Sequence, residues 1–135
     1  MAVEVLTDAL ITINAIVLST RSNQVELDFT IEAKESTAFG DTGRKYVGGL
    51  QNNKCTIALM QDYAAANVEA TVYPLVGTST TLIIRKSSAV VGVTNPTYTL
   101  SNTFLESHTP VKGDVGELMT IQLVFSGGTL VKTTV

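Results

Sequence analysis

The chain has 135 residues, 44% of them hydrophobic, and a formal net charge of −3, which predicts one globular domain over residues 1–135 and excludes global disorder. The acidic balance, without any cluster of Lys and Arg, disfavours tight binding to nucleic acid. No apolar run approaches the roughly 20 residues that cross a bilayer, and the N-terminus lacks a signal-peptide pattern, so we expect no membrane insertion and synthesis without export.

The first strand patterns occur near the N-terminus. Residues 9–13 predict a strand, Asn14 and Ala15 a tight turn, and residues 16–18 a short return strand. The polar residues 19–23 predict a loop. Throughout the chain, the abundance of Thr and Val favours sheets over helices, because β-branched side chains suit a pleated surface.

An unbroken alternation of apolar and polar residues covers residues 25–32, within a strand predicted from residue 24 to residue 33. Successive side chains of a strand point to opposite faces, so one face should carry Glu26, Asp28 and Glu32 into solvent. These carboxylates are about 7 Å apart or more along one strand, too far to converge on Ca²⁺ unaided. The opposite face is expected in the core and consists of Val25, Leu27, Phe29 and Ile31.

A long segment without periodicity covers residues 34–50. Its four glycines and five charged residues predict an exposed loop, and connections of this length usually have a function. The stretch from Gly40 to Lys45 superficially resembles a phosphate-binding loop, but its spacing is wrong and no helix pattern follows. We therefore expect a flexible loop whose mixed charges could contact a neighbouring subunit.

A strand is predicted over residues 54–61, with Cys55, Ile57 and Leu59 on one face. Cys55 is the only cysteine, so no disulfide within the chain can form. Its place in an apolar strand pattern predicts a buried, unreactive thiol that packs as a small hydrophobic side chain.

Residues 62–76 are the only good helix candidate. Val68, Val72 and Leu75 fall on one apolar stripe, together with Val76, and should pack against a sheet. Asp62 or Asn67 could cap the start of this helix, and Gly77 is placed to end it in the left-handed conformation. Because Pro74 has no N–H and disturbs the last turn, the helix should be short and depend on docking.

The C-terminal half returns to strands. Residues 82–84 are apolar on both faces and predict a covered strand. A further strand is expected from residue 95, followed by a turn at residues 112–116 and a strand at residues 119–125. Residues 129–135 form a β-prone tail that could pair with another chain. In the strand from residue 95, one face should hold Tyr98, Leu100 and Phe104, and the other Thr97, Thr99, Ser101 and Thr103.

This order of elements predicts an all-β fold, mainly an antiparallel β-sandwich or barrel, with one flanking α-helix. Catalytic patterns are scarce. One His and one Cys cannot build a Cys/His metal cluster, and no Gly-x-Ser-x-Gly motif is present. His108 is expected to be a surface or hydrogen-bonded loop residue, not a general base. We expect no enzyme activity and no cofactor.

Several short motifs, in their order and spacing around the central helix, resemble the tail tube proteins of long-tailed bacteriophages. They cover roughly residues 36–125 and include Phe39-Gly40-Asp41, Arg44-Lys45-Tyr46, Gly49-Leu50, Gln61-Asp62-Tyr63, Val68-Glu69-Ala70, Pro74-Leu75-Val76-Gly77, Thr94-Asn95-Pro96-Thr97-Tyr98, Leu105-Glu106-Ser107 and Pro110-Val111-Lys112-Gly113-Asp114-Val115-Gly116.

The resemblance implies a structural virion protein with a sandwich-like subunit and one helix. Six subunits form a ring whose inner strands join into a continuous barrel, and rings stack into a hollow tube. In this family DNA passes through the tube into the host, without specific binding, after a tape-measure protein has left. Tail terminator or baseplate proteins are further partners. The implied location is the phage tail, assembled in the bacterial host cytoplasm.

The resemblance also implies roles for two groups of residues. Glu26, Asp28 and Glu32 are candidates for the lumen, where an acidic wall would repel DNA phosphates. The candidate contact between rings is the loop that contains Phe39, Asp41, Arg44, Lys45 and Tyr46, together with the C-terminal tail.

Other functions stay open at this point. A head-tail connector, tail-completion or decoration protein is one alternative, and connector and completion proteins would form a single ring. A small β-sandwich module that binds carbohydrate is another, but it should expose aromatic residues on one face, and the chain has no Trp. An enzyme is the least supported alternative.

Overall fold

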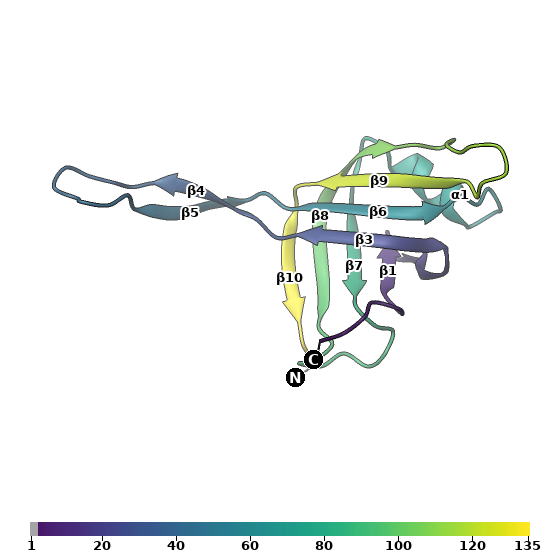
Figure 1. The fold of residues 1–135 in the computed structure, drawn as a ribbon, viewed down its shortest axis with the longest axis horizontal. Coiled ribbons are helices and arrows are strands. Elements are labelled where there is room, and N and C mark those ends of the chain that lie inside the picture. The colour runs from purple at the N-terminus through teal and green to yellow at the C-terminus, as the bar shows by residue number, and fades with distance from the viewer. Residues whose placement is uncertain (1–2) are drawn as a thin grey trace.

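Ten strands and one short α-helix make up residues 3–135, which are the residues described by a computed structural model (Figure 1). Eight strands belong to one sheet and two form a separate hairpin. The strands are β1 (Leu10–Ile13), β2 (Ile16–Val17), β3 (Ser22–Asp28), β4 (Ile31–Glu35), β5 (Tyr46–Gln51), β6 (Lys54–Met60), β7 (Ser79–Arg85), β8 (Thr97–His108), β9 (Thr120–Ser126) and β10 (Thr129–Thr133).

The large sheet folds over into two layers whose strands cross. In Figure 1, β1, β7, β8 and β10 run vertically, whereas β3, β6 and β9 run horizontally across them. Pairing follows the order β2-β1-β7-β8-β9-β6-β3, with β10 also beside β8, and all these ladders are antiparallel. The expected fold class, an antiparallel sandwich or barrel with one flanking helix, is therefore confirmed.

Strand β8 joins the two layers. Its first half, from Thr97 to Ser101, pairs with β10, and its second half, from Phe104 to His108, pairs with β9. Between β9 and β10 the chain turns at Gly127 and Gly128, whose φ angles are +78° and +92°. A Cβ at Gly128 would lie 2.5 Å from the carbonyl oxygen of Ser101, so only glycine fits this corner.

The predicted faces of β8 are correct only for its first half. Leu100 is buried as expected, but Phe104 is 43% exposed and Thr103 is completely buried. Asn102 adopts φ +57°, and the pairing with β7 shifts at this point, so an extra residue enters the strand. One extra residue exchanges the two faces of the residues that follow it, here up to a second shift in the pairing with β9 between Leu105 and Ser107.

The long alternating strand predicted over residues 24–33 is interrupted in the structure. Strand β3 ends at Asp28, and β4 begins a separate hairpin with β5 that projects far from the two layers (Figure 1). Phe29 and Ile31 are therefore 58% and 49% exposed and do not enter the core, contrary to expectation. The predicted loop over residues 34–50 is exposed as expected, but most of it is this hairpin.

A buried asparagine holds the root of the hairpin. Asn53 is 1% exposed, and its Oδ1 accepts a hydrogen bond from the backbone N–H of Thr30 at 3.1 Å. Its Nδ2 donates to Gln51 Oε1 and to the carbonyl of Gly128, at 2.8 and 3.1 Å. Since a buried amide must satisfy its hydrogen bonds, Asn53 fixes where the chain leaves β3 and ties that point to the glycine corner.

The helix is shorter than predicted. Residues Val68–Val72 form α1, and Tyr73–Leu75 continue as one 3₁₀ turn that contains Pro74. Before Asn67 the chain is irregular because Ala66 adopts φ +61° and Asp62 accepts a hydrogen bond from the N–H of Ala64. Gly77 follows with φ +82°, as expected for a residue that ends a helix. No helix within residues 3–135 has the length and apolar character needed to span a membrane.

The core lies between the two layers and is aliphatic, with Phe125 as its only aromatic member. On β6, Cys55, Ile57 and Leu59 are all completely buried, as their alternation predicted. Val68 and Val72 are also completely buried, whereas Leu75 is partly buried and packs against this core. The short helix therefore closes one end of the core instead of covering a whole sheet.

The packing of the core can be tested through the reactivity of the buried Cys55 thiol. Desolvation, followed by the charges of Asp28 and Glu26, raises the pKa of the Cys55 thiol from 9.0 to about 12. The folded state therefore favours the neutral thiol: this contribution to stability is fully present below about pH 9 and is lost as the pH rises through about 12.

We expect native Cys55 to resist alkylation by iodoacetamide at mildly alkaline pH and to react rapidly in denaturant, because the thiolate is the reactive form. The labelled fraction is measured by mass spectrometry. A Val115→Cys variant provides the positive control, because position 115 is fully exposed. Equal labelling rates at the two cysteines would contradict the placement of Cys55 in the core.

Candidate assembly surfaces

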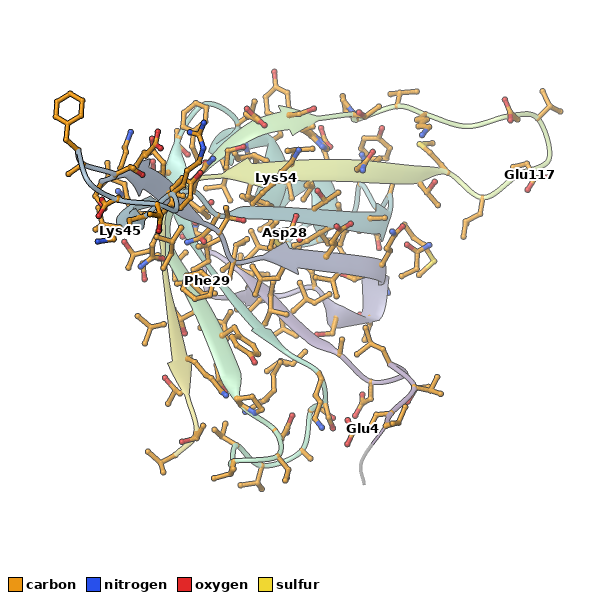
Figure 2. The ribbon with its side chains drawn as sticks, turned by 60° about the vertical axis from the view of Figure 1, so that its left-hand side comes forward. Glu4, Asp28, Phe29, Lys45, Lys54 and Glu117 are labelled. Atoms are coloured by element: carbon orange, nitrogen blue, oxygen red, sulfur yellow. The ribbon has the colours of Figure 1, made fainter. Side chains whose placement is uncertain are left out.

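The outer face of β3, β6 and β9 carries the polar residues that alternate with the core. Glu26 lies opposite Thr56, which lies opposite Val124 on β9. Asp28 lies opposite Lys54 in the next row, and Lys54 lies opposite Ser126. Figure 2 shows Asp28 and Lys54 on these neighbouring strands. Two of the three predicted acidic residues therefore share one face with polar residues of β6 and β9.

The structure adds a carboxylate to this face that sequence reasoning missed. Glu106 of β8 is exposed, and its Oε1 accepts a hydrogen bond from Ser126 Oγ at 2.8 Å. The extra residue at Asn102 contributes to this, because it exchanges the faces of the residues that follow, and Glu106 itself lies in a second irregularity, where the pairing with β9 shifts between Leu105 and Ser107. We define the acidic face as Glu26, Asp28, Lys54 and Glu106, which carries three carboxylates and one lysine.

Glu32 does not belong to the acidic face. It lies on β4 of the hairpin, beyond the interruption at Phe29 and Thr30, and its carboxylate forms an ion pair with Lys34. The predicted grouping of Glu26, Asp28 and Glu32 on one strand is therefore wrong. The reason is that Asn53 redirects the chain immediately after Asp28.

The hairpin satisfies its own charges. Between residues 31 and 51 there are three acidic and three basic residues, and each acid pairs with a base of the same hairpin. Arg44 Nη1 lies 3.0 Å from Glu35 Oε2, and Lys45 Nζ lies 3.0 Å from Asp41 Oδ1. The hydrogen bond from the N–H of Ala38, and then Lys45, lowers the pKa of the Asp41 carboxyl. The charged residues predicted for contacts between rings therefore brace the tip.

The side chains that the hairpin leaves free for contact with a partner are apolar. Phe39 at its tip is fully exposed, and Tyr46 is 58% exposed. Val47 and Leu50 of β5 are exposed as well. A surface with paired charges and several free apolar side chains suits contact with another protein surface.

Several strand edges lack a partner within residues 3–135. Strand β3 pairs only with β6, and β10 pairs only with β8. The last residues of β8, beyond Leu105, pair with β9 on one side and with no strand on the other. The acidic face thus lies between two unpaired edges, those of β3 and of the end of β8. Unpaired edges are templates for strand addition, so pairing of these edges or of the β10 tail with another chain stays a prediction.

The helix side of the molecule holds a polar cluster that the sequence did not predict. The side chain of His108 is 2% exposed, and its Nε2 lies 3.0 Å from Glu69 Oε2. Gln61 Nε2 donates to the same carboxylate at 3.1 Å and to the carbonyl of Pro110 at 2.8 Å. His108 is thus hydrogen-bonded but lies at the end of a strand, and the cluster ties α1 to β8.

None of these surfaces has the geometry of a metal or phosphate site. Among residues 3–135, no three His, Cys, Asp or Glu side chains are placed to share a metal ion. The glycine-containing stretch from Gly40 to Lys45 is the hairpin tip, and no helix follows it. The arrangement offers flat faces, unpaired edges and one projecting hairpin, which can form protein contacts.

No protein-family model and no curated protein sequence matches the chain. Solved structures do share its fold. A chain in the virion of a native gene transfer agent particle has a TM-score of 0.70 at 14% identity, with 93% of this chain and 95% of that chain covered. A chain in the extended sheath-tube complex of the extracellular contractile injection system PVC has a TM-score of 0.71 at 12% identity, covering 99% and 93%.

A third similar chain belongs to the structure of the PVC sheath/tube terminator in the extended state. The TM-score with this chain is 0.74 at 11% identity, and 98% of each chain is covered. The agreement extends over nearly the full length of each chain. The fold is therefore shared with chains of these virion and sheath-tube assemblies, in agreement with the resemblance of the sequence motifs to tail tube proteins.

Proposed function

We propose that this chain is the tube subunit of a phage-like tail and assembles into stacked rings of six around a channel for DNA. The observation that carries the proposal is the acidic face, which lies between the unpaired edges of β3 and β8 on a fold shared with chains of tubular particles. Residues 1–135 act as one assembling domain. The expected location is the virion tail, after assembly in the bacterial host cytoplasm.

In this proposal the unpaired edges meet inside a ring. The edge of β3 in one subunit adds to the end of β8 in the next, so that β3, β6, β9 and β8 of successive subunits form one closed barrel. Closure removes edges that would otherwise promote aggregation. The outer face of these four strands then lines the channel, and the helix and its His108–Glu69 cluster lie outside it.

The acidic face becomes the channel wall. Six copies bring 18 carboxylates and six lysines to each ring, three and one per subunit, so this face carries a net negative charge. Such a wall repels phosphates and keeps DNA from adhering as it passes. The tape-measure protein, the terminator and the baseplate are the further partners, and no cofactor or specific DNA contact takes part.

Negative-stain electron microscopy of the purified protein tests the proposal. Hollow filaments of stacked rings are expected at high protein concentration. Monomers alone, at all concentrations and ionic strengths, would contradict it. Single rings that never stack into filaments would favour the second candidate, a tube-terminating protein. That candidate is supported by the similarity to chains in the PVC terminator and in the tube-terminating cap of the anti-feeding prophage, with TM-scores of 0.74 and 0.72.

Charge reversal tests the lumen assignment. We expect the variant Glu26→Lys, Asp28→Lys, Glu106→Lys to fold and assemble, because single exposed charges contribute little to stability. It changes each ring by 36 charge units, six per subunit, and should make the channel bind DNA. Because released counterions drive such binding, the affinity should fall steeply as the salt concentration rises.

The measurement is the amount of fluorescent DNA that sediments with tubes and survives nuclease treatment, at low and high salt. DNA inside the channel is protected, whereas DNA on an outer surface is digested. The control variant Asp114→Lys, Glu117→Lys adds positive charge to the exposed loop between β8 and β9. Nuclease-sensitive DNA on the triple variant would show that the acidic face points outward, and would leave the tube itself untouched.

A further inference from the structure

A mostly apolar groove lies where the two layers diverge, next to the root of the hairpin. It has a volume of about 460 Å³. Its walls come from the N-terminal segment and from β3, β7, β8 and β10, and they include Leu6, Val25, Leu27, Phe29, Tyr98 and Leu130. Phe29 and Leu6 are 58% and 56% exposed, so the groove is open to solvent in the single subunit. Open apolar surface of this kind is typical of an interaction site.

The hairpin tip has the complementary property. Phe39 is 109% exposed, so its ring makes essentially no contact within its own chain. Aromatic side chains of this size bury roughly 150–250 Å² when they enter a pocket, and they are common anchors of protein interfaces. An aromatic ring held in solvent at the end of a braced hairpin is a costly arrangement unless it is buried on assembly.

Most charges near the contact have a partner of opposite sign. The groove has two charged residues in its wall: Lys86 pairs with Glu4, and Arg85 Nε donates to the carbonyl of Ser87 at 3.0 Å. The charges of the hairpin are paired with one another, as described above. Docking therefore places no unpaired hairpin charge in the contact, while Arg85 keeps its hydrogen bond to the backbone carbonyl of Ser87.

The geometry requires two different copies. Phe29 stands at the hairpin root and lines the groove, whereas Phe39 stands at the tip, about 25–30 Å further along the extended strands. The hairpin projects away from the two layers, so its tip cannot reach the groove of its own chain (Figure 1). A contact between the tip of one copy and the root of the next is heterologous, and such a contact repeats from subunit to subunit and builds a filament where the rotation does not close into a ring.

We propose that the groove of one subunit receives the hairpin tip of another, with Phe39 as the anchoring side chain. This inference rests on the self-assembly proposed above and names the site that makes the axial contact. Phe39 inserts against Phe29, Tyr98 and Leu130, and the ion pairs at Glu35–Arg44 and Asp41–Lys45 keep the tip rigid outside the groove. The groove lies at the root of the hairpin of its own subunit. A subunit whose groove is occupied therefore still presents its own hairpin tip to a further subunit.

Crosslinking between two variants tests the docking directly. One protein carries Ala38→Cys, at an exposed tip position that leaves Phe39 in place, and the other carries Tyr98→Cys. The native Cys55 does not compete because it is completely buried. The two are mixed and treated with a short bis-maleimide, and heterodimers are identified by mass spectrometry. We expect mixed dimers in clear excess over either homodimer. In the control, Val115→Cys, fully exposed on a distant loop, replaces the groove variant and should give no such excess.

The outcomes separate this inference from the proposed function. Tubes that form without the 38–98 crosslink overturn the docking and leave the tube proposal standing. Crosslinked dimers without tubes support the docking and contradict the tube. Neither tubes nor crosslinks would contradict both. If Val5→Cys, in the exposed N-terminal segment, crosslinks to Tyr98→Cys while Ala38→Cys does not, the groove holds a neighbour's N-terminal segment instead.

Side-chain replacement gives a second readout. Phe39→Ala should raise the protein concentration needed for filament assembly about ten-fold or more, as expected for an anchoring aromatic residue. Phe39→Leu should restore part of the assembly, because it keeps an apolar side chain. Neither change can disturb folding through lost contacts, since the ring is fully exposed. Unchanged assembly of Phe39→Ala would overturn the proposal.

Discussion

Replacement of Val72 by Asp should leave the protein unfolded or insoluble. Val72 is completely buried in α1 and belongs to the same core cluster as Val68 and the strands of both layers. A buried carboxylate without a partner costs several kcal/mol, which is comparable to the total stability of a small domain, roughly 5–15 kcal/mol. The nearby acidic residue Glu69 offers no compensation, because it carries the same charge and is already bonded to His108.

The readout is soluble expression, followed by thermal unfolding monitored by circular dichroism. Tyr73→Asp is the matched control: it places the same charge on the next residue, where the side chain is 66% exposed, and should melt normally. Val72→Ala should fold with a loss of about 2 kcal/mol, because it removes buried methyl groups without adding charge. Normal melting of Val72→Asp would show that the helix does not pack as described.

Deletion of Asp41 to Lys45 should give a folded subunit that cannot polymerise. The deleted residues form the hairpin tip, and none of them belongs to the core cluster. The root of the hairpin, held by Asn53, is retained, so thermal unfolding should hardly change. Assembly should fail because the deletion removes Arg44 and Lys45, whose ion pairs hold Phe39 in position.

Electron microscopy and sedimentation measure the assembly of this deletion variant. The double replacement Glu35→Arg, Arg44→Glu is the matched control: it exchanges two charges but keeps their pairing, so tubes should still form. Failure of this control variant would mean that these charges contact a partner directly. Tubes of normal length from the deletion variant would rule out the hairpin tip as the contact between rings.

Much of the fold follows from the sequence alone. Strict alternation at Cys55, Ile57 and Leu59 identified a strand and its buried face, because only one face of a half-buried strand can be apolar. The apolar stripe at Val68 and Val72, followed by Gly77, located the single helix for the same kind of reason. These are local properties: each depends on a periodicity of a few residues and on the conformations that glycine allows.

One long-range hydrogen bond and one strand pairing decided much of the rest. Asn53 accepts the N–H of Thr30 and thereby ends β3 after Asp28, although the alternation continues through Glu32. Sequence periodicity cannot detect this, because the hydrogen bond joins residues 23 positions apart. For the same reason the sequence predicts a loop over residues 34–50. In the structure this segment contains the end of β4 and most of β5, and the pairing of these two strands makes it an ordered hairpin.

The composition of the acidic face also depended on tertiary structure. The sequence supplied Glu26 and Asp28, but the left-handed conformation of Asn102 contributed to turning Glu106 to the same side, and the redirection at Asn53 removed Glu32 from it. Local patterning thus determined the buried face of uninterrupted elements such as β6 and α1, since burial follows the period of a strand or helix, but it was wrong for Phe29, Ile31 and Phe104. Only the tertiary structure decided which surface residues lie together, because a single extra residue or one buried hydrogen bond reorients the side chains that follow.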